Sequence, residues 1–269
     1  MEAYRDFAYV YDEFMDNTPY EQWFGYLCES IRKYGVSRPD RAAKDVLESE
    51  KNLVVDLGCG TGTLTQMFYE AGYDMIGVDN SEEMLSVAME NRDRAGSEIL
   101  YLLQDMRELE LYSTVGTVIS VCDSINYILE PEEVVEVFSL VDNYLDPDGL
   151  FIFDFNTDYK YRELIGERVI AEDRDEMSFI WDNYYDEEER INEYALSIFV
   201  QEEEDLYRKF QEFHYQRGYT LEEMKEYLEA AGLVFLSAED GDEGGPVRAD
   251  SGRIRVIAKE VKKSKALNK

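Results

Sequence analysis

Three alternate glycines that follow an apolar run constrain the fold of this chain more than any other feature. Residues 53–57 have the length and composition of a buried strand, and Gly58, Gly60 and Gly62 come directly after it. Glycines at such a bend permit positive φ angles and let the backbone approach a ligand, because they carry no Cβ. Apolar residues then recur at helical spacing over 64–71. This order predicts a nucleoside-type pocket at the carboxyl end of a parallel strand.

The spacing of the glycines distinguishes between nucleoside ligands. A dinucleotide site has the pattern Gly-x-Gly-x-x-Gly, whose third glycine packs the start of the helix against the strand. Here that position holds Thr63, and the glycine comes one residue earlier. Asp56 also lies within the end of the strand, where its carboxylate would repel a diphosphate and attract a cationic amino group. Both features disfavour a nicotinamide-dependent oxidoreductase.

A second carboxylate, Asp79, ends the next apolar run and can accept hydrogen bonds from both hydroxyls of a ribose. Together these features resemble the class I S-adenosylmethionine-dependent methyltransferases, whose first motif has the form (Asp/Glu)-x-Gly-x-Gly-x-Gly. Asp56 and the three glycines match that motif in full. The resemblance implies a Rossmann-like fold, S-adenosylmethionine as the cofactor and S-adenosylhomocysteine as its product.

The resemblance also implies where the cofactor lies. The glycine loop and Asp56 should face its amino acid portion, Asp79 its ribose and Asp105 its adenine amino group, although Asp105 could instead cap a helix. Aromatic helices at the N-terminus are expected to cover it as a lid, although they could instead be core-facing helices without a functional role. The residues expected to bind the cofactor are Tyr11, Trp23, Asp56, Gly58, Cys59, Gly60, Thr61, Gly62, Asp79, Asn80, Met84, Gln104, Asp105, Met106 and Asp123.

The rest of the pattern predicts a doubly wound α/β domain with a mostly parallel, seven-stranded sheet. The strands are expected at 53–57, 74–79, 99–104, 117–122, 150–155, 234–237 and 254–258. The segment Asp146-Pro147-Asp148-Gly149 is expected to form a turn before the fifth strand.

Three aromatic, β-branched runs interrupt the alternation of strands and helices at 179–185, 191–201 and 206–216. They predict a small antiparallel β cap inserted after the fifth strand. The expected organisation is a methyltransferase domain of 1–157 and 218–261 with lid helices in 1–45, a cap of 158–217 and a basic tail of 262–269.

Four polar residues are candidates for catalysis. Asp123, Asn126 and Tyr127 follow the fourth strand, which in the resembled family lies under the sulfonium, facing the acceptor. Methyl transfer is an in-line SN2 displacement that needs a general base only if the acceptor arrives protonated. His214, the sole histidine, is a further candidate base, with a structural role on a strand as the alternative. The Asp123–Tyr127 element and the insertion resemble small bacterial and archaeal methyltransferases of undefined substrate.

The composition narrows the substrate class. A net charge of −33 repels polyanions, so a small-molecule acceptor is favoured over tRNA or another nucleic acid. A second alternative is a cofactor-binding regulator without catalysis. Three scattered cysteines without metal-ligand spacing predict reduced thiols, no metal and a cytoplasmic protein. No apolar run reaches membrane-spanning length, and the pattern is compatible with a monomer or a homodimer.

Overall fold

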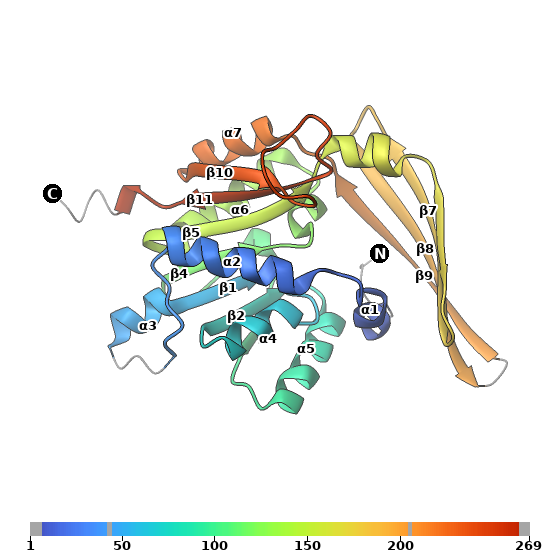
Figure 1. Cartoon of the computed structure of the whole chain (residues 1–269), viewed down its shortest axis with the longest axis horizontal. Helices are drawn as coiled ribbons and strands as arrows, with labels where there is room; N and C mark the ends of the chain where they lie inside the picture. The colour runs from blue at the N-terminus through green and yellow to red at the C-terminus, as the bar shows by residue number, and fades with distance from the viewer. Residues whose placement is uncertain (1–6, 42–44, 204–205, 264–269) are drawn as a thin grey trace.

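A central seven-stranded sheet, with a separate four-stranded sheet beside it, organises the chain (Figure 1). The structure is a computed structural model and describes residues 7–41, 45–203 and 206–263. The central sheet has the order β10-β11-β5-β4-β1-β2-β3. Its strands are β1 (Leu53–Leu57), β2 (Asp74–Asp79), β3 (Leu100–Leu103), β4 (Val115–Ser120), β5 (Leu145–Asn156), β10 (Val234–Asp240) and β11 (Arg253–Lys259).

The central sheet is parallel except at one edge, where β11 pairs antiparallel with both β5 and β10. Successive residues of its strands point to opposite faces, and both faces are apolar. Val54 and Ile152 belong to one buried cluster, whereas Val55 and Phe153 belong to the other. A sheet buried on both sides reads as continuous apolar runs, which is why these strands were recognisable in the sequence.

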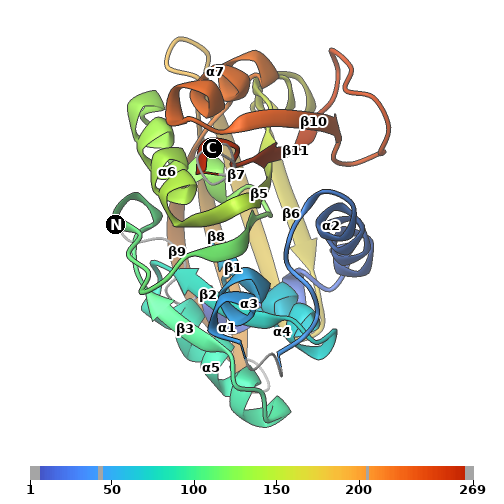
Figure 2. The same ribbon diagram turned by 90° about the vertical axis from the view of Figure 1, so that its left-hand side faces the viewer.

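Helices cover both faces of the central sheet, and Figure 2 shows α2 and α6 on opposite sides of it. One face packs against α2 and α4, and the other against α6 and α7. The helices are α1 (Ala8–Phe14), α2 (Tyr20–Tyr34), α3 (Val46–Asn52), α4 (Thr63–Glu70), α5 (Glu82–Ala95), α6 (Pro131–Tyr144) and α7 (Leu221–Ala231). Among the described residues, no helix has both the length and the apolar character needed to cross a membrane.

Local capping explains where α7 begins and ends. The side chain of Thr220 accepts a hydrogen bond from the backbone N–H of Glu223, whose carboxylate accepts one from the N–H of Thr220. This reciprocal capping box satisfies two backbone donors at the start of the helix. Gly232 ends the helix in the left-handed conformation, with φ at 101°.

The insertion forms the four-stranded antiparallel sheet β6-β7-β8-β9, which we call the cap. Its strands are β6 (Val169–Asp173), β7 (Met177–Asp186), β8 (Ile191–Glu203) and β9 (Leu206–Arg217), preceded by the π-helix η3 (Lys160–Ile165). A bridge between Thr157 and Tyr219 brings the two ends of the insertion together. Apolar side chains on the inner face of the cap pack against α1, which Figure 1 shows between the cap and the central sheet.

The predicted fold class is confirmed, with two local differences. The cap has a fourth strand, β6, which the sequence analysis missed. The expected turn at 146–149 lies within β5, whose backbone instead kinks at Asp148, with φ at 64°. Pairing with β4 resumes after an irregularity at this point, so the polar segment bulges from the ladder without ending the strand.

Two glycine-to-alanine substitutions test this packing. A Cβ at Gly116 would overlap the backbone oxygen of Lys51 and the Oγ of Ser37, so we expect Gly116→Ala to lower the free energy of unfolding by about 1–3 kcal/mol. Gly25 lies in α2 with open space around it, and Gly25→Ala should raise that free energy by about 0.5–1 kcal/mol. Urea titration measures both, and equal stability of the two variants would contradict the packing of α3 against β4.

Candidate functional site

A cavity of about 410 Å³ lies at the carboxyl ends of β1, β2 and β4. Its walls come from the glycine loop, from the ends of these strands and from two tyrosines of the N-terminal helices. The lining residues are Tyr11, Tyr20, Asp56, Leu57, Gly58, Cys59, Gly60, Thr61, Thr63, Leu64, Val78, Asp79, Asn80, Ser81, Glu82, Glu83, Met84, Leu103, Gln104, Met106, Val121, Cys122, Ser124 and Tyr127.

The glycine loop is held against β2. The backbone N–H groups of Gly58 and Cys59 donate to the carbonyl of Val78 at 2.8 and 3.0 Å. Gly58 has φ at 83°, and a Cβ there would lie 2.5 Å from the Oγ of Ser124. Only glycine therefore lets the loop pass this close to the end of β4.

Asp79 joins the loop to the start of α5. One carboxylate oxygen accepts the backbone N–H of Gly60 at 2.8 Å, and the other accepts that of Ser81 at 2.9 Å. Burial raises the pKa of Asp79, although these backbone donors partly offset the effect. Each oxygen has a second lone pair, so the carboxylate can still accept hydrogen bonds from a ligand in the cavity.

Asp56 is the second carboxylate of the cavity, and its side chain is almost completely buried. Burial raises its pKa to about 6, although a 2.6 Å hydrogen bond from the hydroxyl of Thr65 favours the charged form. A desolvated carboxylate with few partners is well suited to a cationic ligand, because the new ion pair would compensate for the lost hydration.

The helix α1 contacts the cavity from the side of the cap. The hydroxyl of Thr61, in the glycine loop, donates to Asp12 at 2.5 Å. The hydroxyl of Tyr11 lies 3.8 Å from the Sγ of Cys122, at the end of β4. These contacts show that α1 lies beside the cavity, and its role as a lid stays a prediction. Residues 1–6 and 42–44 of the expected lid segment, and 264–269 of the expected basic tail, lie outside the described residues.

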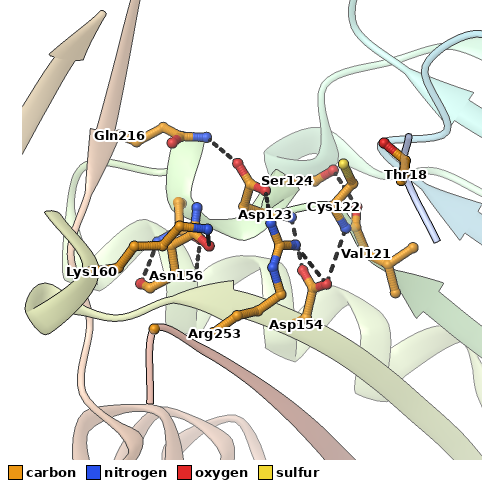
Figure 3. A network of polar contacts seen from close by, with 12 residues as sticks. Thr18, Val121, Cys122, Asp123, Ser124, Asp154, Asn156, Lys160, Gln216 and Arg253 are labelled. Carbon is orange, nitrogen blue, oxygen red and sulfur yellow. Dashed lines mark hydrogen bonds and ion pairs between the residues drawn. The ribbon is translucent and has the colours of Figure 1, made fainter. Parts of the chain in front are cut away.

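The end of β4 carries two successive residues in the left-handed conformation, Cys122 with φ at 63° and Asp123 with φ at 55°. This conformation is costly for residues other than glycine, and strained residues of this kind cluster at functional sites. Asp154 holds it, because its carboxylate accepts the backbone N–H groups of Cys122 at 3.3 Å and Asp123 at 2.8 Å (Figure 3). Burial raises the pKa of Cys122 to about 12, so the thiol is neutral.

A buried arginine neutralises the carboxylates in this turn. Arg253 donates to Asp154 at 2.9 Å and to Asp123 at 2.7 Å, while Gln216 of the cap donates to the other oxygen of Asp123 at 2.7 Å (Figure 3). Burial opposes the charge of Arg253, but the two carboxylates outweigh it and raise the pKa of the guanidinium. Both oxygens of Asp123 are therefore engaged within the protein.

Two of the candidate catalytic residues contact each other across the boundary between the domain and the cap. The hydroxyl of Tyr127, which lines the cavity, lies 3.1 Å from the Nδ1 of His214 on β9. His214 is buried, and the ring of Phe7 stands edge-on to it with a centroid distance of 6.5 Å. This pair offers a path for a proton from the cavity into the cap.

Asn126 has a different environment. Its amide nitrogen donates to the backbone oxygens of Asn156 and Arg217 at 2.8 and 2.7 Å, and its amide oxygen accepts the N–H of Asn156. The completely buried side chain thus joins β5 to the end of the cap. These hydrogen bonds indicate that Asn126 holds the backbone at the ends of β5 and β9 in place.

The cavity brings together most of the predicted cofactor residues. It includes Tyr11, Asp56, Gly58, Cys59, Gly60, Thr61, Asp79, Asn80, Met84, Gln104 and Met106. The predicted residues that do not line it are Trp23, Gly62, Asp105 and Asp123.

Local contacts explain three of these positions. Asp105 caps the short 3₁₀ helix η1 (Met106–Glu108) and forms an ion pair with Arg107 at 2.6 Å, whose hydrogen bonds lower the pKa of Asp105. Trp23 packs on the central sheet, with the guanidinium of Arg253 5.5 Å from its ring centroid. Gly62 begins α4 in the left-handed conformation, with φ at 78°.

Cys122 and Ser124 line the cavity but were not predicted as site residues from the sequence. Cys122 and Ser124 flank Asp123 at the end of β4, so their place in that element was the available signal. Arg253 and Asp154 were also missed. They are 99 positions apart, and no local sequence pattern indicates that they form an ion pair.

Comparison with known proteins finds methyltransferases. The family model described as a methyltransferase domain matches residues 54–149. A protein of Geobacillus sp. (strain WCH70) that is named as a proposed methyltransferase is 32% identical over 260 residues. The match covers 96% of this chain and 100% of the relative. YqeM of Bacillus subtilis (strain 168), also named as a proposed methyltransferase, is 34% identical over 231 residues. The match covers 86% of each chain.

Two further matches have more specific names. The dTDP-3-amino-3,4,6-trideoxy-α-D-glucopyranose N,N-dimethyltransferase of Streptomyces venezuelae is 30% identical over 105 residues, 39% of this chain and 43% of that protein. A solved S-adenosylmethionine-dependent methyltransferase from Clostridium acetobutylicum ATCC 824 has a TM-score of 0.83 at 27% identity, covering 97% of this chain and 100% of that chain.

The raised pKa of Asp56 predicts a pH-dependent stability. Its value of about 6 exceeds the 3.8 of an unperturbed carboxyl, so the folded state binds the proton more tightly than the unfolded state. The stabilisation is present below about pH 4 and is lost as the pH rises through 6. Relative to Asp56→Asn, the wild type should lose about 3 kcal/mol of unfolding free energy between pH 4 and 7.

Urea titration of both proteins over this pH range measures the difference between their unfolding free energies at each pH. The contributions of the other carboxylates cancel in this difference. Asp93→Asn is the control, because the side chain of Asp93 is 71% exposed. A difference between wild type and Asp56→Asn that stays constant with pH would contradict the burial of Asp56.

Proposed function

The chain belongs to the S-adenosylmethionine-dependent methyltransferases, and on that basis we propose that it binds S-adenosylmethionine in the cavity and methylates a small molecule. One observation carries the cofactor assignment: a buried carboxylate, Asp56, and a partly buried one, Asp79, line a single cavity beside a glycine loop. A ligand that bears a cationic amino group and a ribose matches this pair of acceptors.

The contacts around the cavity support a role for each carboxylate. Asp79 would accept the ribose hydroxyls while it continues to hold the N–H groups of Gly60 and Ser81. Asp56 would face the ammonium group, whose charge favours the ionised carboxylate. Met106 and Leu103 offer apolar contacts for an adenine ring, and Gln104 lies between them.

When bound, S-adenosylmethionine would supply an electrophilic methyl group, with S-adenosylhomocysteine as the leaving group when an acceptor attacks the methyl carbon in line. The residues at the end of β4 would position that acceptor, because Cys122, Ser124 and Tyr127 line the cavity on this side. Correct alignment of the reacting atoms can supply much of the lowering of the barrier. In this proposal Asp123 and Asn126 hold the end of β4 in place.

We assign proton acceptance to Tyr127 and His214. A protonated amine must lose a proton before its nitrogen can attack, and a neutral amine or hydroxyl acceptor loses one as the new bond to carbon forms. The Tyr127 hydroxyl can take that proton while it passes its own to the Nδ1 of His214, 3.1 Å away.

Charge and enclosure both favour a small acceptor. The net charge of −33 opposes the approach of a nucleic acid, and the cap and α1 stand beside the cavity. The relative from Streptomyces venezuelae is named for an aminosugar substrate, which agrees with this class of acceptor.

Calorimetry tests the cofactor assignment. We expect S-adenosylmethionine and S-adenosylhomocysteine to bind and NAD(H) not to bind. Asp79→Ala should weaken binding of S-adenosylmethionine by about 1–3 kcal/mol, because it removes hydrogen bonds to a charged group. Asp79→Asn, which keeps one oxygen for the loop, controls for local unfolding, and Asp93→Asn controls for surface charge. Unchanged affinity in both Asp79 variants, or binding of NAD(H) alone, would refute the assignment.

A methyl-transfer assay addresses the acceptor. The protein is incubated with methyl-labelled S-adenosylmethionine and either a metabolite extract or bulk tRNA, over a range of salt concentrations. Label in a small molecule is the expected result. Label in tRNA would support a nucleic-acid methyltransferase, and tight cofactor binding with no transfer to either would support a regulator without catalysis.

A further inference from the structure

A buried carboxylate of the cap, Glu212, lies next to the proposed proton acceptors. Glu212 and His214 are two positions apart on β9, so both side chains point to the inner face of the cap. Their side chains are only 5% and 4% exposed. A carboxylate so deprived of water is stable only if hydrogen-bond donors or positive charge compensate for its lost hydration.

The two oxygens of Glu212 face two different parts of the molecule. Oε1 accepts the backbone N–H of Phe7 at 3.0 Å, just before α1 begins. Oε2 lies 3.3 Å from the Nε2 of His214. One side chain therefore connects the N-terminal segment to the histidine.

The proximity of the Glu212 carboxylate to Nε2 favours one form of the imidazole. A neutral histidine carries its proton on one nitrogen and accepts hydrogen bonds on the other. The carboxylate beside Nε2 favours a proton on that nitrogen, which leaves Nδ1 as the acceptor for the Tyr127 hydroxyl. The titratable groups facing the ring are Tyr127 of η2 (Ser124–Tyr127), Tyr194 of β8 and Glu212 of β9.

We propose that Glu212 is a positioning residue that couples docking of α1 to the proton-accepting pair, holding His214 with its proton on Nε2. This inference rests on the proposed function. As the acceptor's lone pair bonds to the methyl carbon, the sulfur–carbon electron pair returns to sulfur. The acceptor's proton moves to the Tyr127 oxygen, and the Tyr127 proton moves to Nδ1. The resulting imidazolium then lies beside the Glu212 carboxylate.

The other contacts of α1 explain why docking and positioning would be linked. The same helix bonds to the glycine loop through Asp12 and approaches the end of β4 through Tyr11. Val10 packs among the apolar residues of the cap. One helix thus contacts the proposed cofactor loop, the acceptor side of the cavity and the segment held by Glu212. The proton on His214 is therefore positioned in the same conformation in which α1 lies against the cavity.

The single histidine makes the inference directly measurable. In protein labelled with ¹⁵N-histidine and carrying no histidine tag, NMR of the imidazole reports only His214. With S-adenosylhomocysteine as the probe ligand, we expect the Nε2-protonated form in the wild type. Glu212→Ala should give a mixture of the two neutral forms. Glu193→Gln, on the outer face of the cap, is the matched control and should match the wild type.

A proton on Nδ1 in the wild type, or an unchanged Nε2-protonated form in Glu212→Ala, would overturn the proposal. Tyr127→Phe provides a second test if the alanine variant fails to fold, because it removes the partner of Nδ1 and leaves Glu212 beside Nε2. The Nε2-protonated form should persist in this variant, and a mixture of the two neutral forms would show that Tyr127, and not Glu212, sets the position of the proton.

A pair of variants at Phe7 tests the link to α1. Phe7 has φ at −65°, a value that proline adopts without strain. Phe7→Ala keeps the N–H donor to Glu212 and loses the ring, whereas Phe7→Pro loses both. Exchange of the His214 Nε2 proton with water should be about fivefold faster in Phe7→Pro than in Phe7→Ala, because only the proline variant loses the hydrogen bond from the Phe7 N–H to Glu212. Equal rates would exclude coupling through Glu212.

Calorimetry separates failure of this inference from failure of the proposed function. Binding of S-adenosylmethionine depends on the glycine loop and Asp79, and the imidazole form depends on Glu212. Normal cofactor affinity with the wrong imidazole form would overturn the inference alone. Loss of cofactor binding with the expected imidazole form would instead overturn the proposed function.

Discussion

A buried carboxylate, Asp154, organises the region where the strands of the central sheet meet the cap. Its carboxylate accepts hydrogen bonds from the backbone N–H groups of Cys122 and Asp123. These bonds hold both residues in the left-handed conformation, which is unfavourable for residues other than glycine. Asp154 also pairs with Arg253, which reaches on to Asp123. β4, β5 and β11 are joined at their ends by this one group. Removing one partner of such a pair leaves an uncompensated buried charge, so the arrangement is cooperative.

The features that could be predicted from the sequence are those set by local pattern. Strands buried on both faces appear as apolar runs, and the glycine loop is readable because only glycine tolerates the approach of Ser124. β6 was missed because its residues alternate between partly buried and exposed and lack a continuous apolar run. The pairing of Arg253 with Asp154 and the contact of Glu212 with Phe7 join distant positions, which no short pattern specifies.

The case of Asp105 shows how a neighbouring residue changes an expectation drawn from resemblance. The carboxylate follows the third strand as expected, but Arg107 lies two positions later and forms an ion pair with it. The backbone N–H of Arg107 also donates a hydrogen bond to one oxygen of Asp105. A local ion pair with this geometry competes with any contact to a ligand. Met106 and Gln104, on either side of Asp105, are the residues of this segment that line the cavity.

The two ends of the cap are neighbours, since Thr157 and Tyr219 bridge where the chain leaves and re-enters the central domain. An insertion anchored at adjacent points can lengthen, shorten or change its surface without altering the strand order of the sheet that carries it. The cavity beside the glycine loop and the cap therefore belong to separable parts of the polypeptide, and the cap can change as one continuous segment.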